Sequence, residues 1–278
     1  MFEAILLGII QGLTEFLPIS SSAHIRIAGE FMDKAQDPGA RFTAITQIGT
    51  ELAVLIFFRK DIAAIVRAWL RSLRKSNVLN LQEKQSSRMG WLIIIGSIPI
   101  VVLGYFGRHF IENDLRSLWL IGSVLIIFGV ILGIADKFGS SQKTLATLTN
   151  KHGLYYGLAQ AMALIPGVSR SGATIAMGRA LGYSRESALR YSFLLAIPAV
   201  FGSGFYQLNQ GLTEDVSTSV FSLSETVAAT AIAFIVGYLV IAWLIKFVMT
   251  KSFMPFIVYR IGLGSTLLVL LATGVINS

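Results

Sequence analysis

Two proline–serine clusters interrupt apolar parts of the chain and carry the ionisable groups that could do chemistry. The first cluster, residues 11–24, contains one carboxylate, Glu15, and one imidazole, His24. The second cluster, residues 160–174, contains one guanidinium, Arg170. Ionisable groups are costly inside a membrane and usually mark a site there. The two clusters therefore hold the candidate functional residues of this chain.

Both clusters also provide groups that suit a phosphate. Pro18 and Pro166 each end a short helix, and a serine after each break can cap the helix that follows. The start of that helix offers free backbone N–H groups and the positive end of the helix dipole, which bind anions. Two structural explanations stay open. The serines could be caps alone, and Glu15 and Arg170 could form an ion pair that only joins two parts of the chain.

The two clusters match each other without a gap when the chain is shifted by 149 positions, the separation between Gly8 and Gly157. The matched pairs are Gly8 with Gly157, Gln11 with Gln160, Ser20 with Ser169, Ser22 with Ser171, and Gly29 with Gly178. This match predicts two pseudo-repeats, about 1–150 and 151–278, within a single membrane domain that spans 1–278.

The composition is that of an integral membrane protein, because 54% of the residues are hydrophobic and only 14% are charged. Six segments are long and apolar enough to cross a bilayer, about 41–58, 90–107, 117–135, 187–205, 227–247 and 255–276. Four shorter apolar pieces lie at about 2–17, 20–31, 154–165 and 171–181. Each pair of short pieces meets at one of the clusters, as expected of half-helices that enter the membrane and return.

Charged loops set the orientation of these segments. The loop after residue 58 is rich in arginine and lysine and is predicted to be cytoplasmic. Its stretch 62–74 has the spacing of an amphipathic helix on the membrane surface. The 206–225 loop has acidic residues and no basic one, so it is predicted to be external. The net charge of +8 thus reflects membrane orientation rather than nucleic-acid binding.

With this orientation the two breaks enter from opposite faces of the membrane. The sequence therefore predicts an all-α integral membrane protein with six transmembrane helices plus two re-entrant helix pairs in inverted-topology repeats. Three other polar residues in apolar segments are ambiguous. Glu51 could flank the site or pack between helices, Gln160 is interpreted as a buried amide that bridges two helices, and Arg260 is expected to extend toward the cytoplasmic edge.

Taken together, the motifs resemble those of bacterial undecaprenyl-pyrophosphate phosphatase, the bacitracin-resistance type. One signature runs from Gln11 through Glu15 and Phe-Leu-Pro-x-Ser-Ser to His24, and the other is Pro-Gly-x-Ser-Arg-Ser-x-x-Thr from Pro166 to Thr174. The resemblance covers nearly the whole chain, including Gln47-x-Gly49 and Pro255-Phe-x-x-Tyr259-Arg260. Many members carry a second Glu where this chain has Gln11, so that position cannot act as a base or a strong metal ligand here.

The resemblance also implies roles for individual residues. Arg170 would hold the pyrophosphate, because its planar donors match phosphate oxygens. The attacking group is Ser21, His24 or an activated water, with Glu15 or His24 as the base for Ser21. The candidate catalytic residues are Glu15, Ser21, His24 and Arg170, and the candidate substrate-binding residues are Gln11, Ser20, Ser22, Ser169, Ser171 and Thr174.

The implied reaction is hydrolysis of undecaprenyl pyrophosphate to undecaprenyl phosphate and inorganic phosphate. It recycles the lipid carrier of cell-wall synthesis and confers bacitracin resistance. No tightly bound cofactor is expected, and a divalent cation (Mg or Ca) would accompany the substrate's pyrophosphate. The expected location is the bacterial plasma membrane, with the site open to the outer face. The expected partners are the polyprenyl lipid and the bilayer, and a homodimer is left open.

The main alternative is a transporter or flippase of the polyprenyl-phosphate carrier, because inverted repeats with broken helices are typical of transporters. Lipid phosphatases of the acid-phosphatase type also use Ser-x-His and Ser-Arg elements. They require a histidine six residues after the motif arginine, where this chain has Ala176. The sequence therefore argues against that class.

Overall fold

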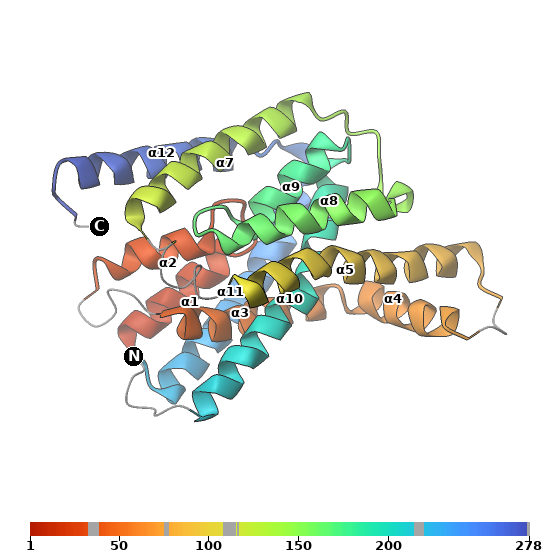
Figure 1. The fold of residues 1–278 in the computed structure, drawn as a ribbon, viewed down its shortest axis with the longest axis horizontal. Helices are drawn as coiled ribbons and strands as arrows, with labels where there is room; N and C mark the ends of the chain where they lie inside the picture. Colours follow the sequence, from red (N-terminus) through yellow and green to blue (C-terminus); the bar gives the residue numbers. More distant parts are fainter. Residues whose placement is uncertain (33–38, 75–77, 108–114, 116, 214–219, 277–278) are drawn as a thin grey trace.

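The computed structural model describes residues 1–32, 39–74, 78–107, 115, 117–213 and 220–276, and these residues form helices and no strand (Figure 1). The helices are α1 (Phe2–Thr14), α2 (Ser21–Gly29), α3 (Gly39–Phe57), α4 (Arg59–Ser72), α5 (Leu81–Phe106), α7 (Leu118–Phe138), α8 (Asn150–Ala161), α9 (Arg170–Ala180), α10 (Arg185–Thr213), α11 (Leu223–Thr250) and α12 (Met254–Ala272), with short 3-10 turns η1 (Leu145–Thr147) and η2 (Met162–Leu164). The all-α prediction is confirmed.

Within the described part of the chain, five helices are long and apolar enough to cross a membrane, namely α5, α7, α10, α11 and α12. They coincide with five of the six predicted spans. The sixth predicted span, 41–58, corresponds to α3, whose apolar stretch Phe42–Phe57 is shorter. The chain is thus a multi-pass membrane protein, while the sixth crossing stays a prediction.

The four short helices meet in pairs at the two breaks. Ser20 is the N-cap of α2 and accepts a hydrogen bond from the Ala23 N–H over 3.4 Å. Ser169 is the N-cap of α9 and accepts one from the Gly172 N–H over 3.1 Å. Both serines adopt positive φ angles, 74° and 69°, which are uncommon for residues other than glycine. The matched serines therefore cap their helices in the same unusual backbone conformation.

The first short helix of each pair packs on a long helix from the opposite half of the chain. In the first half, α1 packs along α11, and in the second half, α8 packs along α5. The matched glycines lie at these two crossings. A Cβ on Gly8 would lie 2.6 Å from the Ala229 carbonyl oxygen, and one on Gly157 would lie 2.4 Å from the Gly96 carbonyl oxygen. The close backbone approach explains why both positions are glycine.

Substituting Gly157 with alanine is expected to destabilise the α8–α5 contact by about 1–3 kcal/mol, because the added methyl group meets backbone that cannot rotate away. Thermal unfolding in detergent measures the change. Gly262→Ala is the matched control, since nothing lies within 4 Å of its added Cβ. Equal stability of the two variants would contradict the close packing.

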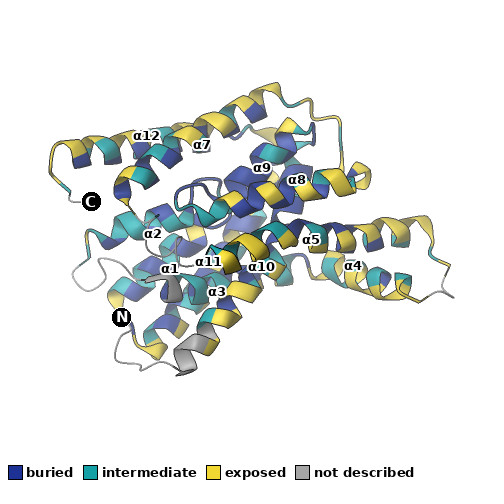
Figure 2. Ribbon diagram, viewed as in Figure 1, coloured by how far each residue is buried: buried dark blue, intermediate teal, exposed yellow. Residues whose placement is uncertain are grey.

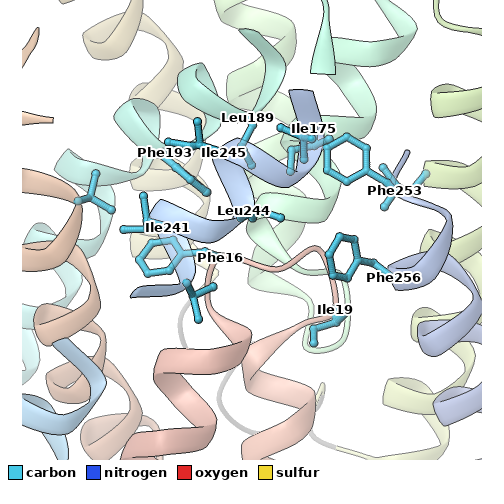
Figure 3. Close-up of a cluster of buried hydrophobic side chains, with 14 of the residues drawn as sticks. Phe16, Ile19, Ile175, Leu189, Phe193, Ile241, Leu244, Ile245, Phe253 and Phe256 are labelled. Atoms are coloured by element: carbon cyan, nitrogen blue, oxygen red, sulfur yellow. The ribbon is translucent and has the colours of Figure 1, made fainter. Parts of the chain in front are cut away.

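A cluster of buried hydrophobic side chains holds the first break in place (Figure 3). Phe16 and Ile19, on the loop between α1 and α2, pack with residues of α11 such as Ile241 and Leu244. The Phe16 ring also meets Phe193 of α10 edge to face, with centroids 5.2 Å apart. The outer helices α4, α5, α7 and α12 carry many exposed residues, whereas the centre of the bundle is mostly buried (Figure 2). Most residues of the first break, 15–20, are buried. The break is therefore non-helical backbone enclosed by protein.

The predicted amphipathic helix at 62–74 is present as α4, and it packs against the first turns of α5. Trp69 and Trp91 meet edge to face, with ring centroids 5.6 Å apart. A capping box formed by Asn80 and Glu83 starts α5. α4 and the start of α5 thus form a helical hairpin, and one side of α4 is covered by protein rather than free on a surface.

Candidate active site

Glu15 is the centre of a hydrogen-bond cluster at the first break. Its Oε2 accepts hydrogen bonds from Gln11 Nε2 and from Ser21 Oγ, both over 2.6 Å. Its Oε1 accepts one from Arg170 Nη2 over 2.7 Å. The Glu15 residue is 7% exposed. One buried carboxylate therefore collects a hydroxyl, an amide and a guanidinium from three parts of the site.

Backbone contacts also join the second break to the first. Ser171 Oγ donates to the Leu17 carbonyl oxygen over 3.0 Å. Together with the Arg170–Glu15 pair, this places the start of α9 beside the end of α1. The structure thus brings the predicted residues of both clusters into one site, although they are about 150 positions apart in sequence.

At each helix start, the N-cap serine pairs with the serine two residues later. Ser20 Oγ lies 3.2 Å from Ser22 Oγ, and Ser169 Oγ lies 3.1 Å from Ser171 Oγ. The N–H groups of the first helical turn have no partner within their own helix. Both helix starts therefore present N–H groups, hydroxyls and a positive dipole end at the same place, which favours an anion between them.

His24 is bound through both ring nitrogens. Its Nδ1 lies 2.7 Å from the Ser20 carbonyl oxygen, and its Nε2 lies 2.8 Å from the Tyr259 hydroxyl. Because a carbonyl only accepts, Nδ1 carries the hydrogen, and Nε2 of the neutral ring accepts from Tyr259. The two rings are stacked with centroids 5.5 Å apart. In this arrangement His24 is engaged with α12 rather than with Ser21.

Thr174 lies behind the site. It is fully buried, and its hydroxyl donates to the Arg170 carbonyl oxygen over 2.7 Å. The same hydroxyl lies 2.5 Å from Ser192 Oγ on α10. Thr174 therefore supports the first turn of α9 in this structure, and its predicted contact with phosphate stays a prediction.

Arg260 does not extend toward the membrane edge, so that prediction is wrong. The residue is fully buried, and its guanidinium donates to four backbone carbonyls, three at the two breaks and one on α7. The acceptors are Pro18, Val168, Gly167 and Leu125, at 2.8–3.3 Å. Pro18 and Gly167 are equivalent positions under the 149-residue shift. One arginine thus binds the carbonyl oxygen of the equivalent residue at both breaks. These carbonyls need a donor from elsewhere because the chain is not helical there.

Substituting Arg260 with leucine is expected to lower the free energy of unfolding by about 3 kcal/mol or more, because four buried carbonyls lose their donors. Phosphate release should fall with it, since the breaks lose their common anchor. Both are measured on purified protein in detergent. Arg67→Leu is the control, because Arg67 is exposed and its guanidinium donates to one carbonyl of its own helix, that of Ala63. A variant at 260 as stable as this control would show that the breaks do not depend on Arg260.

Glu51 and Gln160 are the remaining polar groups of interest in the apolar helices. Glu51 is fully buried, and its Oε2 lies 3.6 Å from Arg170 Nη2. Glu51 is therefore a counter-charge beside the site. Gln160 is also fully buried, but its side-chain amide has no hydrogen-bond partner among the described residues. The predicted bridge between helices through Gln160 is thus not formed there.

A cavity of about 930 Å³ opens directly on the two breaks. The polar part of its wall at the breaks includes Glu15, Ser20, Ser21, Ser22, Ser169 and Arg170. Its apolar wall includes Ile100, Val101, Tyr105, Phe106, Leu164 and Val200. Tyr105 and Phe106 of α5 are 75% and 81% exposed on the outside of the protein. The cavity therefore extends from groups that suit a phosphate to the apolar outer surface of the protein.

Comparisons with known proteins show the family of this chain. A sequence model of the family described as bacitracin resistance protein BacA matches residues 4–266. The chain belongs to this family. It is 57% identical over 277 residues to an undecaprenyl-diphosphatase of Pseudarthrobacter chlorophenolicus, covering 100% of this chain and 99% of the relative. It is 56% identical over 276 residues to the undecaprenyl-diphosphatase of Micrococcus luteus, with 99% of each chain covered. It is also 56% identical over 276 residues to undecaprenyl-diphosphatase 2 of Agrobacterium fabrum, covering 99% and 97%.

Two residues of this BacA family member were missing from the predicted site although they contact it. Tyr259 binds His24, and Arg260 binds both breaks. The available signal was the position of Arg260 within an apolar helix, since a charge there requires a polar partner in the protein. No pattern in the sequence could indicate which carbonyls or ring it meets.

Proposed function

We propose that this chain hydrolyses undecaprenyl pyrophosphate to undecaprenyl phosphate and inorganic phosphate. The observation that carries the proposal is the Ser21 hydroxyl held 2.6 Å from the buried Glu15 carboxylate, beside Arg170 and two helix N-termini. A hydroxyl hydrogen-bonded to a base is an activated nucleophile. Relatives that are more than half identical over the full chain are named undecaprenyl-diphosphatase, which supports the same substrate here.

In the proposed reaction the diphosphate lies between the two breaks. Arg170 and the N–H groups at the starts of α2 and α9 bind its oxygens. Ser21 Oγ attacks the terminal phosphorus, Glu15 takes the hydroxyl proton, and the bridging P–O bond breaks to release undecaprenyl phosphate. Glu15 passes that proton to solvent and then accepts one from water, which attacks the phosphoserine. Glu15 returns this proton to Ser21 Oγ as inorganic phosphate leaves. Positioning and positive groups supply most of the rate gain, as is usual for phosphoryl transfer.

The shape of the cavity supports a lipid substrate that enters from the outer side. Its apolar wall includes the C-terminal end of α5, where the prenyl tail can remain in contact with lipid. The cavity also reaches Thr43 near the start of α3 and Gln207 toward the end of α10. The end of α3 and the start of α5 are connected through α4. This connection is rich in arginine and lysine, so the positive-inside rule predicts that it is cytoplasmic. We therefore propose that the cavity opens on the outer face of the membrane, in a protein with six crossings and two re-entrant helix pairs.

The side chains at the break do not suit a resident divalent ion. Among the described residues there is no group of three His, Cys, Asp or Glu close enough to hold one. Both oxygens of Glu15 already accept hydrogen bonds, one of them from the positively charged Arg170. Mg²⁺ or Ca²⁺ requires about six oxygen ligands. We propose that any divalent ion arrives on the pyrophosphate oxygens of the substrate.

Phosphate release in detergent micelles tests the enzyme against the transporter. Purified protein is mixed with C55 pyrophosphate, and inorganic phosphate is measured with and without a chelator. Micelles have no second compartment, so a flippase gives no signal. The expected result is release that Glu15→Gln abolishes. Release no greater than that of Glu15→Gln would overturn the proposed function and favour the transporter.

A further inference from the structure

Glu51 is a buried carboxyl group that the proposed reaction does not use. It lies on α3, one helical turn after Gln47, which lines the cavity. Glu51 itself is 0% exposed, and neither of its oxygens has a hydrogen-bond partner among the described residues. A buried carboxyl group without donors is costly, so its presence beside the site requires an explanation.

The charged neighbour of Glu51 is the arginine that holds Glu15. Arg170 Nη2 donates to Glu15 Oε1 over 2.7 Å and lies 3.6 Å from Glu51 Oε2. One nitrogen therefore faces two carboxyl groups and is bonded to one of them. Closing the second distance to about 2.8 Å, the usual length of a charged hydrogen bond, needs a shift of less than about 1 Å. Gln11, the other polar neighbour of Glu15, is uncharged and cannot replace Glu51 as a partner for Arg170.

This arrangement matters because the resting contact opposes catalysis. While Arg170 is bonded to Glu15, the positive guanidinium attracts the negative charge of the carboxylate, and transfer of the Ser21 proton to Glu15 would cancel that attraction. A bound pyrophosphate also needs the planar donors of Arg170. Proton transfer to Glu15 therefore loses less of this attraction once Arg170 turns away from it.

We propose that Glu51 is a positioning residue that receives the Arg170 guanidinium when pyrophosphate binds, and so frees Glu15 to deprotonate Ser21. The proposal rests on the proposed function. Glu51 does not line the cavity, so it acts through Arg170 rather than by touching the substrate. In the resting structure Arg170 is bonded to Glu15, and in the substrate complex it bridges Glu51 and the phosphate.

The test separates turnover from binding in Glu51→Gln, which keeps the side-chain shape and removes the charge. Turnover is measured as phosphate release from C55 pyrophosphate in micelles, and binding as the affinity for a non-hydrolysable methylene analogue of that lipid. The kcat is expected to fall about tenfold or more, because Glu15 stays paired with Arg170. Affinity should be unchanged or stronger, since a negative charge near an anion has been removed. A misfolded site would lose both.

Two further variants complete the test. Glu51→Asp keeps the charge but moves it farther from Arg170, because the aspartate side chain is shorter. Its kcat should therefore lie between those of the wild type and Glu51→Gln. Thr46→Val is the matched control, because Thr46 is equally buried on α3 and its hydroxyl bonds only its own helix, so its turnover should equal that of the wild type. Wild-type kcat in Glu51→Gln, no advantage of aspartate over glutamine, or parallel loss of binding and stability would each overturn the proposal. Inactive wild-type protein would instead reject the proposed function.

Discussion

Substituting Ser21 with alanine is expected to reduce phosphate release about a thousandfold or more, as found when an activated nucleophile is removed. The Ser21 hydroxyl is the group hydrogen-bonded to Glu15 Oε2 within the cavity. His24, the other candidate nucleophile, has both ring nitrogens engaged with Ser20 and Tyr259. The kcat on C55 pyrophosphate in micelles measures the effect, and binding of the non-hydrolysable analogue should persist.

Ser22→Ala is the matched control for this prediction. Ser22 is the next residue of α2 and also lines the cavity, but its hydroxyl contacts the Ser20 hydroxyl rather than a base. Its loss should be much smaller than that of Ser21→Ala. A rapid quench of the wild type should also trap phosphate on Ser21, detected by mass spectrometry. Substantial turnover by Ser21→Ala would assign the attack to water or His24 instead.

Much of this architecture could be predicted because it depends on local chemistry. Proline after a short apolar segment predicts each break, and the serines that follow within a few residues predict the cap, as seen at Ser20 and Ser169. Length and hydropathy predicted five of the long helices. The repeat and the charge pattern also predicted that Glu15 and Arg170 lie in one site, although the two residues are far apart in sequence.

The contacts that were not predicted depend on how the helices pack. The Arg260 side chain was expected to extend toward the cytoplasmic edge of the membrane. Instead, α12 packs against α7, and the side chain points inward to carbonyls at both breaks. A hydrophobic pattern shows that a helix is buried but does not show which partner meets each polar side chain. Thr174 illustrates the same limit, since its hydroxyl meets Ser192 on a helix whose register the sequence does not determine.

Substituting Arg170 with lysine is expected to reduce kcat/KM about a hundredfold although the positive charge is kept. Arginine presents a planar set of donors, and here Arg170 lines the cavity while its Nη2 donates to Glu15. A lysine ammonium is a point charge that cannot bind two phosphate oxygens with two parallel donors in one plane. Phosphate release and analogue binding should both weaken. Arg190→Lys is the control, because that arginine pairs at the surface with Glu186, and such pairs contribute little.

The same variant separates a phosphate clamp from an ion pair that only joins the halves. If the pair were structural, Arg170→Lys and Glu15→Gln would each lower stability, and the double variant would lose little more than either one. If Arg170 binds phosphate, stability should change little in Arg170→Lys while binding of the analogue weakens. Ser171 and Arg260 provide independent links between the breaks, so the halves do not depend on Arg170 alone. Near-normal turnover in Arg170→Lys would refute the clamp, and weaker analogue binding at unchanged stability would distinguish it from a structural ion pair.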